Sequence, residues 1–65
     1  MITINGERKE YDKSLSIREY LMKEGYRIER IAVEVNEEIV PKSQYDTRHF
    51  NDEDKIEVIN FVGGG

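Results

Sequence analysis

The 65-residue sequence contains no cysteine, a single proline and a single histidine. Without cysteine the chain can form neither disulfides nor thiolate metal sites, and it has no cysteine nucleophile. Its uninterrupted apolar runs are far shorter than the roughly 20 residues that a membrane-spanning helix needs. The first ten residues also lack the basic and then apolar pattern of a signal peptide. We therefore expect a soluble cytoplasmic protein with no membrane partner.

The charge balance disfavours nucleic acid as a partner. Ten basic and 14 acidic residues give a net charge of −4, whereas binding to phosphates requires a basic face. At this length the chain makes one domain, and without disulfides it must rely on an efficiently layered core. We expect a single domain over residues 1–62 and a flexible glycine tail over residues 63–65.

The first half of the sequence predicts a β-hairpin followed by a helix. Residues 1–6 alternate apolar and polar side chains, and Asn5-Gly6 suits a type I′ turn into a return strand over residues 7–11. Ser16 and Glu19 have the spacing of a capping box. Gly25 suits a left-handed helix end. The pattern predicts a helix over about residues 17–24, which must pack on a sheet because it is short.

The second half predicts three more strands. Residues 30–41 read as two strands around Asn36-Glu37, and residues 54–62 alternate as the last strand. Tyr45 and Phe50 lie between them and are expected to plug the end of the core. The order predicts an α+β fold of the ubiquitin-like β-grasp type, a mixed sheet of four to five strands on one main helix. We expect the first and last strands to pair in parallel, and the core to comprise Ile2, Ile4, Ile17, Leu21, Ile31, Val33, Val35, Ile56 and Val58.

Residues suited to catalysis are scarce. His49 is a lone histidine in a polar loop, and the carboxylates of residues 51–55 lie in a predicted turn, so we interpret both as solvated surface. The aspartates lack the spacing of a calcium loop. The three final glycines hold no phosphate, since no helix follows them. The chain is therefore not expected to be an enzyme, and it has no predicted metal or cofactor site.

The C-terminal tail carries the remaining chemistry. The last strand leads to Phe61, and four more residues can extend about 13–14 Å beyond it. Lacking Cβ atoms, Gly63, Gly64 and Gly65 could thread a narrow channel in another protein. The terminal carboxylate of Gly65 could then be activated by a partner that supplies ATP. A flexible end with no function is equally compatible with the tail alone.

Four stretches resemble the ThiS-like sulfur carriers of thiamin biosynthesis, which are ubiquitin-like β-grasp proteins: ING, LSIREYL, IAVEVNEEIVPKSQY and DEDKIEVINFVGGG. The resemblance implies that an E1-like enzyme adenylates the carboxylate of Gly65, which then becomes a thiocarboxylate. ATP is used by that partner, and this chain binds no cofactor. The sulfur, supplied by a cysteine desulfurase or a similar donor, passes to thiazole synthase. The resemblance also implies that Phe61, Val62, Gly63 and Gly64 bind the partner proteins. It further implies that the carrier is a monomer when free.

Two turns depart from the family pattern. The family commonly has Asn-Gly where this chain has Asn36-Glu37, and Asp-Gly-Asp where it has Asp52-Glu53-Asp54. Because glutamate disfavours positive φ, these turns must change type or carry strain.

Three other functions stay open on sequence alone. They are the small subunit of molybdopterin synthase, a ubiquitin-like modifier of lysines, and an interaction domain with an inert tail. The sequence does not identify the sulfur acceptor or the sulfur source, and it does not show whether a precursor is trimmed to expose the glycines.

Overall fold

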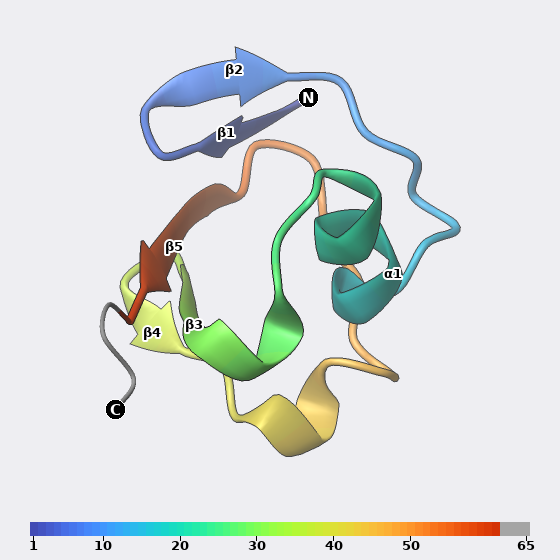
Figure 1. The fold of residues 1–65 in the computed structure, drawn as a ribbon. Helices are drawn as coiled ribbons and strands as arrows, with labels where there is room; N and C mark the ends of the chain where they lie inside the picture. Colours follow the sequence, from blue (N-terminus) through green and yellow to red (C-terminus); the bar gives the residue numbers. More distant parts are fainter. Residues whose placement is uncertain (62–65) are drawn as a thin grey trace.

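The computed structural model describes residues 1–61 (Figure 1). Within these residues, five strands, one α-helix and two 3-10 helices follow one another in the order β1 (Ile2–Ile4), β2 (Glu7–Lys9), α1 (Ile17–Lys23), η1 (Ile28–Arg30), β3 (Ile31–Val35), β4 (Glu38–Ile39), η2 (Lys42–Gln44) and β5 (Lys55–Asn60). The predicted hairpin, helix and three later strands are all present. The two 3-10 helices were not predicted.

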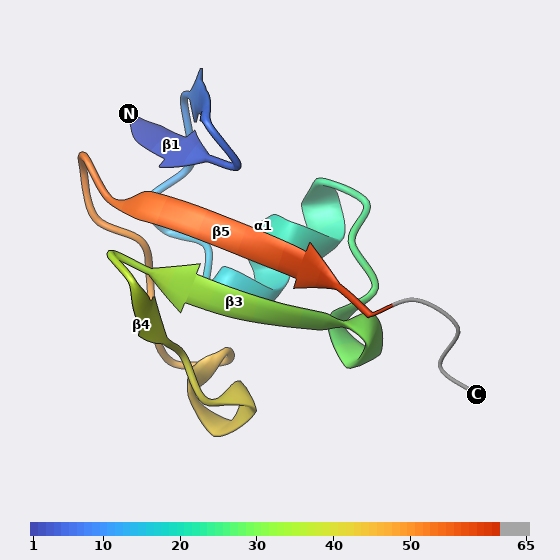
Figure 2. The ribbon, with the colours of Figure 1, turned by 90° about the vertical axis from the view of Figure 1, so that its left-hand side faces the viewer.

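The strands form one mixed sheet in the order β2-β1-β5-β3-β4. β1 and β5 run parallel, and the other neighbours are antiparallel. This confirms the predicted α+β arrangement and the parallel pairing of the first and last strands. In Figure 2 the strands β5 and β3 lie in front of α1, so the sheet has one face on the helix and one face turned outward.

The helix begins and ends where its sequence signals lie. The Glu19 amide donates to Ser16 Oγ at 3.1 Å, and the Ser16 amide donates to Glu19 Oε1 at 2.8 Å, which completes the capping box. Gly25 follows the helix with φ +92°. Ile17, Tyr20 and Leu21 are buried, so the helix is stabilised by the sheet beneath it.

All nine residues predicted for the core are buried. Tyr45 and Phe50 are also buried, and the ring of Phe50 packs edge-on against Tyr20 with centroids 5.7 Å apart. The loop after Pro41 therefore closes the end of the core, as predicted. Three further core residues, Tyr20, Ile28 and Val40, were absent from the predicted core. Ile28 lies in η1, whose spacing matches neither a strand nor an α-helix.

The turns at Asn36-Glu37 and Asp52-Glu53-Asp54, which depart from the family pattern, have a left-handed backbone at glutamate and are therefore strained. Glu37 has φ 71° and Glu53 has φ 67°, and both residues are exposed. In this region Cβ crowds the following carbonyl oxygen, which costs about 1–2 kcal/mol for residues other than glycine. The tertiary structure on both sides holds these glutamates in a conformation that their own side chains disfavour.

Replacing Glu37 by glycine should stabilise the protein. Glu37→Gly removes the Cβ at positive φ, and this gain exceeds the added entropy of the unfolded chain, so unfolding free energy should rise by about 0.5–1 kcal/mol. For a domain of this size, the melting temperature should increase by about 2–8 °C in a calorimetric scan. The adjacent strand residue provides the control, since Glu38→Gly should lower the melting temperature. Equal effects of both changes would contradict the account.

The interpretation of the carboxylates of residues 51–55 as solvated surface was wrong for Asp54. Its side chain is buried, and it accepts hydrogen bonds from the Asn36 side-chain amide at 3.0 Å and from the Asn51 backbone amide at 2.8 Å. Asp54 thus joins the two unusual turns. Asp52 is exposed, as predicted, and hydrogen bonds from Lys13, the N-terminal amine and Tyr11 lower the pKa of its carboxyl.

Candidate functional site

The candidate site is the end of β5 and the surfaces on either side of it. Asn60 pairs with Ile31 in the antiparallel ladder, and the Phe61 amide donates to the Arg30 carbonyl at 2.8 Å. The chain is therefore held by the sheet up to Phe61, the last described residue. Figure 2 shows β5 leading out of the sheet beside the start of β3. The position of Phe61 is therefore fixed relative to the start of β3.

The outward face of the sheet is apolar next to this end of β5. Ile56 and Val58 point into the core, so the alternate residue Ile59 points outward, and it lies opposite Ala32 of β3. The exposed fractions of Ile39, Phe61 and Ile59 are 73%, 56% and 45%. We call Ala32, Ile39, Ile59 and Phe61 the apolar sheet face.

Two carboxylates border the apolar sheet face. Glu34 of β3 lies directly opposite Glu57 of β5, and Ile39 of β4 lies on the other side of Glu34. Like charges opposite one another across a strand pair destabilise a sheet. A basic side chain placed between Glu34 and Glu57 would relieve this repulsion. The outward face therefore suits a partner surface that combines apolar and basic groups.

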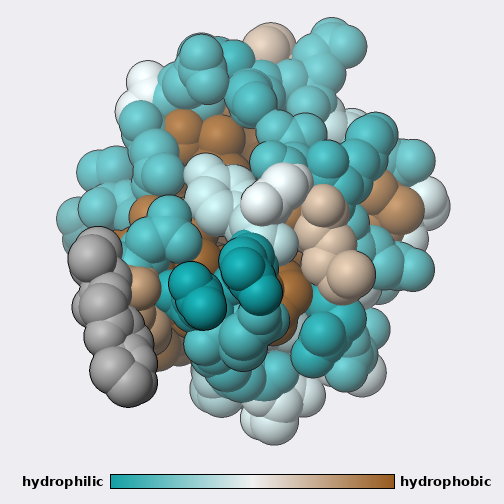
Figure 3. Space-filling view, viewed as in Figure 1, coloured by the Kyte–Doolittle hydropathy of each residue, from teal (hydrophilic) through white to brown (hydrophobic). Residues whose placement is uncertain are grey.

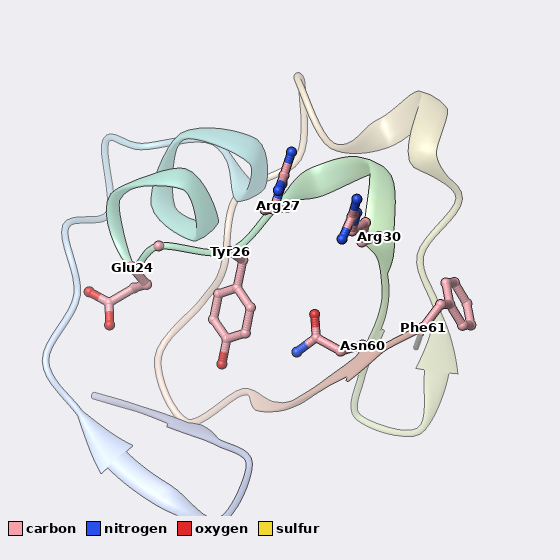
Figure 4. A pocket seen from close by; sticks show the side chains of 7 residues that line it. Glu24, Tyr26, Arg27, Arg30, Asn60 and Phe61 are labelled. Carbon is pink, nitrogen blue, oxygen red and sulfur yellow. The ribbon is translucent and has the colours of Figure 1, made fainter. Parts of the chain in front are cut away.

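On the helix side, the end of β5 lines an open groove of about 480 Å³. We call it the tail-base groove; its lining residues are Glu24, Gly25, Tyr26, Arg27, Arg30, Asn60 and Phe61. Figure 4 shows Tyr26, Arg30 and Asn60 around the same opening, with the Phe61 ring turned away from Tyr26. The end of β5 thus separates the groove from the apolar sheet face.

The charge of the tail-base groove is mainly positive. Among residues 1–61, Glu24 supplies the one carboxylate of the lining, and it is paired at 2.8 Å with Lys9, which lies outside the lining. Arg27 Nε lies 3.4 Å from Glu29 Oε1, with both side chains 67% exposed, so solvent weakens this pair. Within residues 1–61, Arg30 makes no salt bridge to a carboxylate. In Figure 3 strongly hydrophilic groups lie over η1 and the start of β3, with hydrophobic surface between them.

Residues that could perform catalysis are not brought together in the described part of the chain. His49 is exposed, and its Nδ1 lies 2.8 Å from the Leu15 carbonyl oxygen. Residues 1–61 contain no group of three or more histidine, aspartate or glutamate side chains placed to hold a metal ion. No helix among the described residues is long and apolar enough to cross a membrane.

Of the predicted site residues, the structure places Phe61 at the end of β5, exposed and beside both surfaces. Val62, Gly63, Gly64 and Gly65 lie outside the described residues. Four further residues beside the strand end were not predicted from the sequence: Tyr26, Arg27, Arg30 and Asn60. The sequence shows that Arg27 and Arg30 follow the helix. Their position beside Phe61 depends on the pairing of β3 with β5, which could not be predicted from the sequence.

Comparison with known proteins gives consistent matches over nearly the whole chain. The model of the ThiS family matches residues 2–65. The chain is 34% identical over 67 residues to the sulfur carrier protein ThiS of Bacillus subtilis, and the match covers 100% of both proteins. The crystal structure of the thiamine biosynthesis protein ThiS from Geobacter metallireducens superposes with a TM-score of 0.79 at 31% identity, and the match covers 98% of this chain and 97% of that one.

A longer protein contains a similar segment. The chain is 42% identical over 64 residues to a thiazole synthase of Paramagnetospirillum magneticum. That match covers 98% of this chain but 20% of the thiazole synthase. The chain therefore corresponds to about one fifth of that relative.

Proposed function

Because this chain belongs to the ThiS family of sulfur carrier proteins of thiamine biosynthesis, we propose that it carries sulfur as a thiocarboxylate on Gly65. The protein is a carrier and not a catalyst. An E1-like partner binds ATP, and the Gly65 carboxylate attacks the α-phosphate to give an acyl adenylate and pyrophosphate. The persulfide of a cysteine desulfurase or a similar donor then attacks the acyl adenylate and displaces AMP, and a thiol reductant cleaves the resulting acyl disulfide to leave the thiocarboxylate.

The observation that carries this proposal is the fixed end of β5. The Phe61 amide is hydrogen-bonded to the Arg30 carbonyl, so the domain presents the following residues from a defined point. Four residues can span about 13–14 Å when extended, long enough to reach into a partner's active site. Gly63, Gly64 and Gly65 have no Cβ and so fit a narrow channel, in which Val62 and Phe61 would seat the base of the tail.

The apolar sheet face supports docking of the adenylating partner. Ile39, Ile59 and Phe61 are exposed beside the point where the tail leaves, so a partner seated on them would surround the tail. Exposed apolar groups gathered on one face are typical of protein interaction sites. Glu34 and Glu57 add a preference for basic groups on that partner.

Placing a charge on this face should weaken docking. Ile59→Glu would bury a carboxylate against apolar groups of the partner and next to Glu57, so the Kd for the adenylating enzyme should rise by about 10–100-fold in calorimetric titration. Met22→Glu is the matched control, because Met22 is an exposed apolar residue of α1 on the other side of the sheet. It should leave the Kd unchanged. An unchanged Kd for Ile59→Glu, with both variants folded, would contradict docking through this face.

For the acceptor, we propose thiazole synthase. A protein named thiazole synthase contains a segment 42% identical to this chain, which supports a functional link between the two activities. We further propose that the carrier is a cytoplasmic monomer when free.

The test is transfer of labelled sulfur. The thiolated carrier is prepared with ³⁵S and mixed separately with thiazole synthase and with the large subunit of molybdopterin synthase, each with its own co-substrates. We expect label in the thiazole product and none in molybdopterin. Label in molybdopterin alone, or a carrier joined to lysines of other proteins, would overturn the assignment of the acceptor.

A further inference from the structure

The tail-base groove places positive charge beside the tail of a protein whose net charge is −4. Arg27 and Arg30 line it together with Tyr26 and Asn60 (Figure 4). Its carboxylate, Glu24, is engaged by Lys9. The groove is thus a local cationic site on an acidic protein, and such a site favours an anionic occupant.

The position of Arg30 is fixed relative to the tail. Its carbonyl accepts the hydrogen bond from the Phe61 amide at 2.8 Å, and the next residue, Ile31, pairs with Asn60. A contact made by the Arg30 side chain therefore acts on the strand end from which the tail starts. The groove and the apolar sheet face lie on opposite sides of that strand end, so a partner that encloses the tail meets both.

The reach of the tail excludes the nucleotide as the occupant. An extended tail carries its terminal carboxylate about 13–14 Å beyond Phe61, and the adenylate forms at that end. An arginine side chain at the base of the tail does not extend so far. We therefore expect the anion that meets Arg30 on the partner's protein surface at the mouth of the channel.

We propose that the tail-base groove receives an acidic side chain of the E1-like adenylating enzyme, with Arg30 as its main contact and Arg27 as a second cation. This inference rests on the proposed function and identifies part of the partner surface. The contact is exposed, so it acts chiefly on the rate of association and on its dependence on salt.

The test is charge reversal in the full-length carrier. Association with the adenylating enzyme, without ATP, is followed at low and at high ionic strength for the parent and for Arg30→Glu. We expect Arg30→Glu to raise the Kd about tenfold at low ionic strength, mainly through slower association, and the difference to shrink at high ionic strength. Arg30→Lys should restore most of the affinity, since it keeps the charge.

Arg48→Glu is the matched control. Arg48 lies near the start of α1, where its carbonyl accepts from the Ile17 amide at 2.8 Å, away from the groove lining. Arg48→Glu changes the net charge by the same amount as Arg30→Glu, so comparing the two variants removes any general electrostatic effect on binding. Arg30→Glu must bind at least several-fold more weakly than Arg48→Glu, with both variants melting like the parent.

Equal binding by the two variants would overturn the inference. It would also fail if NMR of the free carrier showed the Gly65 carboxylate paired with Arg30, because the groove would then hold the protein's own C-terminus. Neither result affects the proposed function, which is judged separately by whether the parent protein acquires a thiocarboxylate.

Discussion

Deleting Gly65 should lower the rate of carrier-dependent ATP–pyrophosphate exchange by the adenylating enzyme at least about 100-fold. The deletion withdraws the terminal carboxylate by about 3.5 Å, whereas a displacement of about 1 Å can already cost on the order of 100-fold in rate. Binding of the carrier should change little, since the apolar sheet face and the tail-base groove are intact. The deletion should therefore lower the maximal exchange rate. It should leave unchanged the carrier concentration at which the exchange rate is half-maximal.

Two further variants distinguish the effect of tail length from the effect of side-chain size within the tail. Adding a fourth glycine after Gly65 moves the carboxylate by the same distance in the other direction, and it should also impair exchange. Gly64→Ala keeps the length but adds a Cβ where the channel is narrow, and it should slow exchange as well. Amide spectra of residues 1–61 should match the parent in all three variants. Full exchange activity after deletion of Gly65 would show that the reacting group is elsewhere.

Leu21→Ala should leave the protein largely unfolded at moderate temperature. Leu21 is fully buried between α1 and the sheet, and truncation of such a residue costs about 2–5 kcal/mol. A domain of this length has a total stability of only about 3–10 kcal/mol. The loss should be visible as a lower melting temperature and a lower midpoint in urea, with the slope of the urea transition preserved.

The neighbouring residue provides the control for this change. Met22 follows Leu21 in α1 but is exposed, so Met22→Ala removes a side chain of similar size from the same helix without opening a cavity. It should change the melting temperature by a small amount only. If Leu21→Ala melted like Met22→Ala, the helix would not be held to the sheet by the contacts described above.

The fold followed from the sequence wherever a local signal and the hydrophobic period agreed. Asn5-Gly6, the Ser16–Glu19 capping box and Gly25 each mark a boundary that the structure reproduces within a residue or two. The alternation of residues 55–58 identified which side chains of β5 point inward. These signals depend on neighbours in sequence and on burial of one face, so no tertiary information was needed.

What the sequence did not predict depends on contacts between distant residues. Asp54 was interpreted as solvated because it lies in a predicted turn, but its hydrogen bond to Asn36 forms only when the two turns meet. Glu37 lies between β3 and β4, and Glu53 lies in the loop before β5; the structure around each turn holds both at positive φ, against the preference of glutamate. The tail-base groove likewise required the register that places Arg30 beside Phe61.

The central claim is that the terminal carboxylate of Gly65 becomes a thiocarboxylate, and intact-protein mass spectrometry tests it most directly. The full-length chain is incubated with its adenylating enzyme, ATP and a sulfur donor, and then weighed and fragmented. The account predicts a mass increase equal to the difference between one sulfur and one oxygen atom, located on Gly65 and absent without ATP. An unchanged mass, or an increase located on an internal residue, would contradict it.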